Sequence, residues 1–172
     1  MGRHVDRLAD LVRACDEFLA SREDVPLALQ HGDVCPENVL VDEDCRLTAV
    51  LDRGFLTVLA DPVLEMALTS GFFDMYGPHA LRTDQRLTDL FVEAFGAQRE
   101  DVLRFKAVYA LIGANACSGT ADGHFQWCAA VLERPDVRAA VLGQLERTRS
   151  TAERVLTDCA GSVLVMGRVG CC

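Results

Sequence analysis

The stretch that most constrains this chain is Gln30–Gly54, QHGDVCPENVLVDEDCRLTAVLDRG. Within it, two short apolar runs rich in strand-forming residues flank a polar turn, which is the pattern of a β-hairpin. We expect the two strands at Val39–Asp42 and Leu47–Leu51. The hairpin therefore predicts that residues at its two open ends meet in space.

Three polar side chains lie around this predicted hairpin. It sets Asn38 roughly opposite Asp52, and Asp33 lies on the loop that precedes the first strand. An amide oxygen and a carboxylate are hard ligands, and a site with few carboxylates and room for phosphates suits Mg²⁺. Phosphoryl transfer uses the same parts, namely an Asp for the acceptor hydroxyl and an Asn and a second Asp for the metal. The pattern therefore favours a metal-and-base site.

Each of these residues also has a simpler interpretation. An Asp or Asn at the edge of a hairpin is, taken singly, more often a turn former or a cap than a metal ligand. The combination favours the site, because Gly32, Pro36 and Gly54, which can shape the backbone of such a loop, occur with them. His31 is expected to be a buried, hydrogen-bonded structural residue with no chemical role.

Two motifs carry a resemblance to a known family, HGDVCPENVL at 31–40 and LDRG at 51–54. They resemble the catalytic loop and the metal-binding motif of the aminoglycoside phosphotransferase family, the small-molecule branch of the protein-kinase-like fold. Further along, ADPVLEMA at 60–67 is similar to the family segment G-D-P-x-x-D-L-A, and residues 121–128 resemble its late helical region.

The resemblance implies a fold, an activity and a set of roles. The implied fold is α+β but mostly α, the C-terminal lobe of a kinase-like phosphotransferase with a catalytic-loop β-hairpin. The implied reaction transfers the γ-phosphoryl group of ATP to a hydroxyl of a small molecule. Asp33 would be the catalytic base, Asn38 and Asp52 the Mg²⁺ ligands, and Asp61 a structural residue that braces the loop.

A β-rich lobe with a lysine for the nucleotide phosphates normally precedes the catalytic loop of a kinase-like enzyme. Here the residues before His31 read as one helix, and the sole lysine, Lys106, falls on a helix expected to be buried. We therefore expect that the N-terminal lobe is missing, that the truncated domain occupies 1–160, and that 161–172 form a loose strand or a disordered tail. Such a chain should bind ATP weakly and be weak or inactive in transfer.

Two alternatives to an active phosphotransferase stay open. One is a non-catalytic kinase-like lobe that acts as a binding or interaction module. The other is a metal-dependent hydrolase, because Mg²⁺ with an Asp base also activates water. Removal of a lobe should also uncover apolar surface beside the loop, through which the chain would self-associate.

Charge and hydropathy exclude several partners. The net charge of −9 and pI of 4.8 disfavour nucleic acid and favour a cationic small acceptor. Charged residues interrupt every apolar run before it reaches membrane-spanning length. The amino terminus lacks a secretory signal, and the 8 cysteines show no metal-site spacing, so we expect a cytoplasmic protein. The terminal pair Cys171 and Cys172 matches no lipidation motif.

A short strand is expected at Leu27–Gln30, where it leads into His31, and most of the rest of the chain is expected to be helical. The segment 55–60 shows no clear period and is expected to be a short connection. The helix expected at Arg99–Cys117 should be central, with Val108, Tyr109 and Ile112 among its interior residues. The expected helices are Val5–Ala20, Asp61–Met75 with Asp61 as the N-cap, a helix that is capped by Thr83 or Asp84 and ends at Phe95 before Gly96, Arg99–Cys117, Asp122–Glu133 and Asp136–Thr157.

Overall fold

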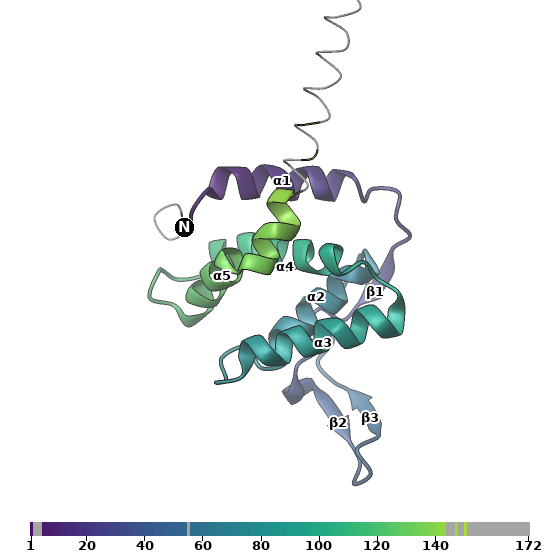
Figure 1. Ribbon diagram of the computed structural model, residues 1–172. Coiled ribbons are helices and arrows are strands. Elements are labelled where there is room, and N and C mark those ends of the chain that lie inside the picture. Colours follow the sequence, from purple (N-terminus) through teal and green to yellow (C-terminus); the bar gives the residue numbers. More distant parts are fainter. Residues whose placement is uncertain (2–4, 55, 144–146, 148–149, 151–172) are drawn as a thin grey trace, which may run out of the picture.

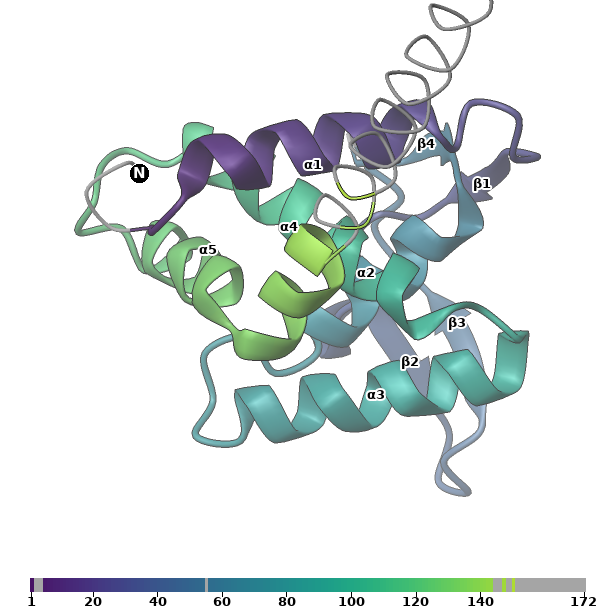
Figure 2. The ribbon, with the colours of Figure 1, turned by 45° about the horizontal axis from the view of Figure 1, so that its top comes forward.

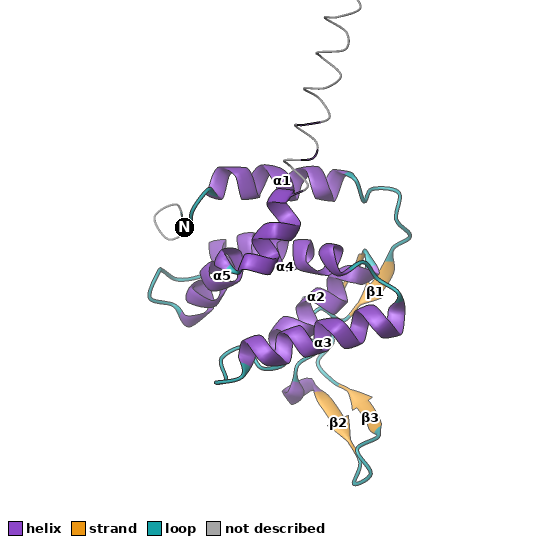
Figure 3. Cartoon of the chain, in the orientation of Figure 1, coloured by secondary structure: helices purple, strands orange, loops and turns teal. Residues whose placement is uncertain are grey.

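Helices packed around one central helix form the body of the molecule, and two small sheets lie to one side (Figures 1 and 3). The computed structural model describes residues 1, 5–54, 56–143, 147 and 150. The helices are α1 (Leu8–Ala20), α2 (Pro62–Phe72), α3 (Ala80–Phe95), α4 (Arg99–Asn115) and α5 (Gly123–Glu133), with the 3-10 helix η1 (Pro36–Asn38). The strands are β1 (Ala28–Gln30), β2 (Val39–Val41), β3 (Leu47–Val50) and β4 (Val58–Ala60). The fold is therefore mostly helical α+β.

Helix α4 is the centre of the core, as expected. It packs against α1, α2, α3 and α5, and α1 crosses over it in Figure 2. Val102, Ala107 and Ala110 on α4 are 0% exposed, since small and branched side chains let the neighbouring helices approach closely. Ile112 was expected inside but is 64% exposed, because it lies at the rim of the groove between α1 and α4.

Helix starts and ends were predicted unevenly. Asp61 caps α2 by accepting from the backbone N–H of Val63 at 2.9 Å, and Gly96 ends α3 in the left-handed conformation, both as expected. The prediction that Thr83 or Asp84 caps α3 is wrong, because α3 already begins at Ala80. A further helix begins at residue 135, and its predicted end, like the predicted tail, lies outside the described residues.

The predicted hairpin is confirmed, with each strand one residue shorter than expected. In β2–β3, Val39 pairs with Val50, and a register shift separates Leu40 from Val41. The predicted connection at 55–60 is wrong in part, because its second half is strand β4. The backbone groups of β4 pair antiparallel with those of β1, which sequence periodicity alone could not reveal in three residues.

A buried ionic cluster joins three helices and the residue after α5. Lys106 of α4 donates to Ser70 of α2 at 2.6 Å and pairs with Asp84 of α3, and Arg134 pairs with the second carboxylate oxygen of Asp84. Burial lowers the pKa of Lys106 to about 8, although the Asp84 charge raises it. The ammonium group of Lys106 therefore lies in the core, where Ser70 and Asp84 bind it.

Several strand leucines are exposed, as expected for apolar surface beside the loop. Leu29 of β1 is 65% exposed, its partner Leu59 is 66% exposed, and Leu47 of β3 is 63% exposed. No helix within the described ranges is long and apolar enough to cross a membrane.

Candidate functional site

His31 fixes the loop that carries Asp33. The Nδ1 atom of His31 accepts from the backbone N–H of Asp33 at 3.2 Å, so the proton of the neutral ring must be on Nε2. Nε2 then donates to the carbonyl of Leu51 at 2.7 Å. His31 was expected to be buried but is half-buried. Its two ring nitrogens link the Asp33 loop to Leu51, the residue that precedes Asp52.

Glu65 of α2 holds the same loop from the other side. Its carboxylate accepts from the backbone N–H of His31 at 2.6 Å and from that of Gly32 at 3.2 Å. Gly32 has a φ of 83°, and a Cβ there would lie 2.3 Å from the carbonyl oxygen of Leu56. Only glycine therefore allows the backbone to pass this point.

Asp33 and Asn38 lie in contact, as the loop motif predicts. Asn38 donates from Nδ2 to the carbonyl of Asp33 at 2.9 Å and to its carboxylate Oδ2 at 3.2 Å. The turn between them is made by η1, which begins at Pro36. Because Nδ2 makes both bonds to Asp33, the amide oxygen of Asn38 takes no part in them.

Asp52 follows the hairpin directly. The N–H of Leu51 donates to the carbonyl of Asn38 at 2.8 Å, so the backbone partner of Asn38 is Leu51, one residue before Asp52. Asp52 is exposed and has a φ of 57°, a conformation that aspartate tolerates better than most residues.

An amide oxygen and a carboxylate from neighbouring positions are a donor set of the kind that fits Mg²⁺. Within the described ranges, no group of three or more His, Cys, Asp or Glu side chains could hold a metal ion.

Asp61 braces the end of β4. Besides its cap on α2, its carboxylate pairs with Arg22 at 2.7 Å, and Arg22 also pairs with Asp101 of α4 at 2.9 Å. Gln30 of β1 donates to the carbonyls of Ala60 and Asp61 at 3.2 and 3.1 Å. These bonds anchor the two strands that flank the loop to the helical body.

A cavity of about 450 Å³ opens beside Asp33. Its wall combines loop residues, the end of α2, and side chains from α4 and α5. The carboxylates of Asp33, Glu37 and Asp74 share this wall with four aromatic rings. The lining residues are Asp33, Cys35, Pro36, Glu37, Leu56, Phe72, Phe73, Asp74, Met75, Tyr76, Tyr109 and His124.

The sequence did not point to most of this wall. Tyr109 was read as part of the core, and burial does raise its pKa to about 12. His124 lies within the segment 121–128 that resembles the family, but neither it nor Tyr76 was assigned a role, because the two side chains meet Tyr109 only when the segment after α2, α4 and α5 pack. We call Tyr76, Tyr109 and His124 the tyrosine–histidine cluster.

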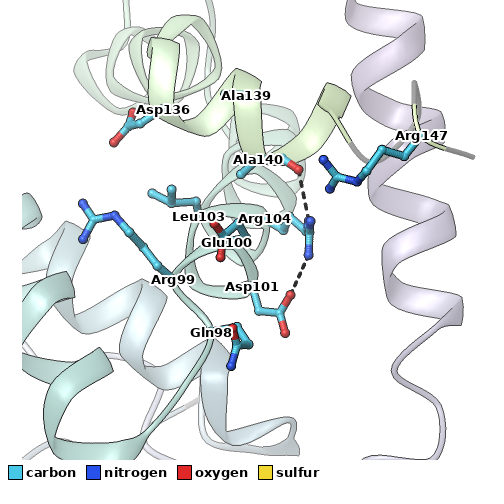
Figure 4. Close-up of a pocket in the computed structure, with 10 residues that line it drawn as sticks. All are labelled: Gln98, Arg99, Glu100, Asp101, Leu103, Arg104, Asp136, Ala139, Ala140 and Arg147. Atoms are coloured by element: carbon cyan, nitrogen blue, oxygen red, sulfur yellow. Dashed lines mark hydrogen bonds and ion pairs between the residues drawn. The ribbon is translucent and has the colours of Figure 1, made fainter.

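A second cavity, of about 560 Å³, lies at the start of α4 (Figure 4). Arg104 on its wall is already engaged, because it pairs with Asp101 at 2.7 Å and donates to the carbonyl of Ala140 at 3.1 Å. No residue of the Asp33 loop lines it. Of these two cavities, only the one beside Asp33 adjoins the candidate site.

Comparison with known proteins gives one relative and one family. An aminoglycoside 3'-phosphotransferase from Streptomyces fradiae is 35% identical over 97 residues, which are 53% of this chain and 32% of the relative. The chain thus spans about a third of the length of this relative. No solved structure matches this chain. The model of the phosphotransferase enzyme family (APH) matches residues 2–106, more than half of the 172 residues, and the chain therefore belongs to that family.

Proposed function

We propose that this chain carries the catalytic loop and the acceptor side of an ATP-dependent phosphotransferase that acts on a hydroxyl of a small molecule. Asp33 supports this proposal most directly, because its side chain belongs both to the hydrogen-bonded loop and to the wall of the 450 Å³ cavity. A hydroxyl bound in that cavity would meet the carboxylate that removes its proton.

The roles of the polar residues follow from their contacts. Asn38 and Asp52 would hold Mg²⁺, which when bound neutralises charge on the nucleotide phosphates. The two bonds from Nδ2 of Asn38 restrict the position of Asp33 relative to this pair. Glu65 and His31 keep the loop in place, so positioning rather than covalent chemistry is the work of these residues.

A cationic acceptor fits the cavity best. Asp33, Glu37 and Asp74 supply negative charge, and the rings of Phe72, Phe73 and the two tyrosines offer faces to amines or sugar rings. Aminoglycosides combine several amines with several hydroxyls, and the relative from Streptomyces fradiae is described by that substrate class. We propose an aminoglycoside or a similar amino-alcohol as the acceptor, in the cytoplasm where ATP is available.

One observation favours a second candidate, a non-catalytic kinase-like lobe. Lys106, the sole lysine, is 2% exposed and paired with Asp84, so it cannot contact a nucleotide phosphate. Without this lysine as a partner for the phosphates, ATP should bind weakly. We therefore expect weak transfer or none from the isolated chain, whose phosphotransferase domain we place at 1–160.

The test pairs a binding measurement with a transfer assay. Mg²⁺·ATP is titrated into the wild type and into Asp52→Ala, and transfer is assayed with kanamycin B and a panel of amino-alcohols. Asp33→Ala should lower any transfer by about 10²- to 10⁴-fold. Asp44→Ala, which removes an exposed carboxylate from the hairpin turn, is the matched control and should leave transfer unchanged.

The outcomes separate the two candidates. Transfer that depends on Asp33 but not on Asp44 supports the phosphotransferase and contradicts the proposal of a non-catalytic module. A wild type that transfers no phosphoryl group to kanamycin B or to any amino-alcohol of the panel supports the module. Transfer that survives Asp33→Ala contradicts the assignment of the base.

A further inference from the structure

The tyrosine–histidine cluster forms a short chain of hydrogen bonds in the acceptor cavity. His124 lies between two hydroxyls, with Nδ1 3.2 Å from the oxygen of Tyr76 and Nε2 3.2 Å from the oxygen of Tyr109. Trp127 stacks on the His124 ring at 5.7 Å with an interplanar angle of 21°, and Asp122 accepts from the backbone N–H of His124 at 2.8 Å. Stacking on Trp127 therefore holds the ring of His124, and the bond to Asp122 holds its backbone.

A neutral imidazole has one N–H and one bare nitrogen, so the chain of bonds has a direction. In one tautomer Tyr109 donates to Nε2, and Nδ1–H donates to the oxygen of Tyr76. In the other tautomer Tyr76 donates to Nδ1, and Nε2–H donates to Tyr109. The hydroxyl that accepts from the ring keeps its own proton for another partner.

Burial distinguishes the two tautomers. Tyr109 is half-buried, whereas Tyr76 is 68% exposed. Among the described residues, no other hydrogen-bond partner is found for the hydroxyl of Tyr109. An unsatisfied hydrogen-bond donor costs more free energy when it is buried than when it is exposed. The tautomer in which the Tyr109 hydroxyl donates to His124 is therefore favoured, because the donor left over is the exposed hydroxyl of Tyr76.

We infer that His124 carries its proton on Nδ1 and donates it to Tyr76, so that the Tyr76 hydroxyl donates a hydrogen bond to an oxygen of the bound acceptor. This inference rests on the proposed function for the identity of the ligand. Tyr76 is then an acceptor-binding residue, and His124 and Tyr109 are positioning residues that act through it. The cluster selects acceptors that place a hydroxyl or ether oxygen beside Tyr76.

The direction of the chain can be measured without any ligand. The ¹⁵N chemical shifts of the two ring nitrogens of His124 distinguish the tautomers by NMR. We expect the Nδ1–H form in the wild type. In Tyr109→Phe, which removes only the donor to Nε2, we expect a mixture of both forms. A wild type in the Nε2–H form overturns the inference.

The contact with the acceptor is measured by calorimetric titration with kanamycin B. Tyr76→Phe keeps the ring and removes one hydroxyl from an exposed residue, so the fold should persist. We expect affinity to fall about five- to tenfold, the loss of one net hydrogen bond. Tyr109→Phe is the matched control, with an expected loss smaller than that of Tyr76→Phe.

Failure of this inference and failure of the proposed function give different results. If Tyr76→Phe binds kanamycin B as tightly as the wild type, the role of Tyr76 is wrong and the proposed acceptor class stands. If the wild type does not bind kanamycin B at all, the proposed acceptor class fails and the role of Tyr76 fails with it.

Discussion

The helical body and the strand-bearing loop are stabilised by different forces. In the body, Leu11 of α1 and Leu132 of α5 are 0% exposed, whereas Leu29 and Leu59 in the strands are 65% and 66% exposed. The loop between β1 and β4 is held instead by hydrogen bonds, above all those of the Glu65 carboxylate. The residues proposed for chemistry therefore depend on polar contacts with a body that has a core of its own.

The largest expected effect tests this contrast directly. Leu11→Ala should lower the free energy of unfolding by about 3–4 kcal/mol, because it leaves a cavity in the core. Leu29→Ala, the same change at an exposed strand position, should cost no more than about 0.5 kcal/mol. Urea unfolding of both variants measures the difference, and equal losses would show that the strands share the core after all.

The next effect concerns the backbone of the loop. Gly32→Ala should destabilise the chain by about 2–3 kcal/mol, because it combines a left-handed residue with a clash against the Leu56 carbonyl. Gly96→Ala is the control, since Gly96 also has a positive φ of 67° but has nothing within 4 Å of its Cβ position. It should cost about 1 kcal/mol. Equal costs in urea unfolding would mean that the close approach at Leu56 is not a constraint.

Lys106→Met should cost about 2 kcal/mol at pH 7, because Asp84 loses one of its two cationic partners. The folded pKa of Lys106 is about 8, below its ordinary value of 10.5, so between these pH values the unfolded chain binds more protons. Wild-type stability relative to the variant should therefore rise with pH in that window, by about 1 kcal/mol per pH unit. A difference that stays constant from pH 7 to 10 would contradict the lowered pKa.

Glu65→Gln tests the polar attachment of the loop. An amide accepts more weakly than a carboxylate, so the bonds from His31 and Gly32 should weaken and stability should fall by about 1–2 kcal/mol. The amide signals of His31 and Gly32 in an NMR spectrum should shift with it. Glu93→Gln on the exposed face of α3 is the control. Unchanged His31 and Gly32 signals would disprove the attachment.

The smallest effect concerns association of the exposed strands. We propose that the exposed apolar face around Leu29 and Leu59 mediates self-association, because soluble proteins seldom leave such surface uncovered. Sedimentation at increasing concentration should show a dimer in the wild type and a weaker one in Leu29→Glu. A wild type that stays monomeric at high concentration would count against the proposal.

The sequence predicted the parts of the fold that depend on local signals. Asp61-Pro62 marked the start of α2, Gly96 marked the end of α3, and the polar turn marked the hairpin, because capping and turn chemistry act over a few residues. Strand β4 was missed, since it is too short to show a period and exists through its pairing with β1. Asp84 was read as a cap because its partner Lys106 comes from a distant helix.

The candidate site also has a part that the sequence predicted and a part that it did not. The contact between Asp33 and Asn38 follows from a short motif and the turn between them, and the structure contains it. The roles of Asn38 and Asp52 towards a metal stay predictions. The tyrosine–histidine cluster was not predicted as a unit, because its three members come from the segment after α2 and from two helices that meet only in the packed body.

The pairing of β1 with β4 has a consequence for how such a protein can change. Gln30 and Val58 are partners in the register, so the segment 31–57 leaves the body and returns to it at a single point. Such a closed segment can be exchanged between relatives as one cassette. Tyr76, Tyr109 and His124 lie outside it, whereas Asp33 and Glu37 lie inside it, so the wall of the 450 Å³ cavity is shared between the closed segment and the body, and an exchange of the segment would change only one side of that wall.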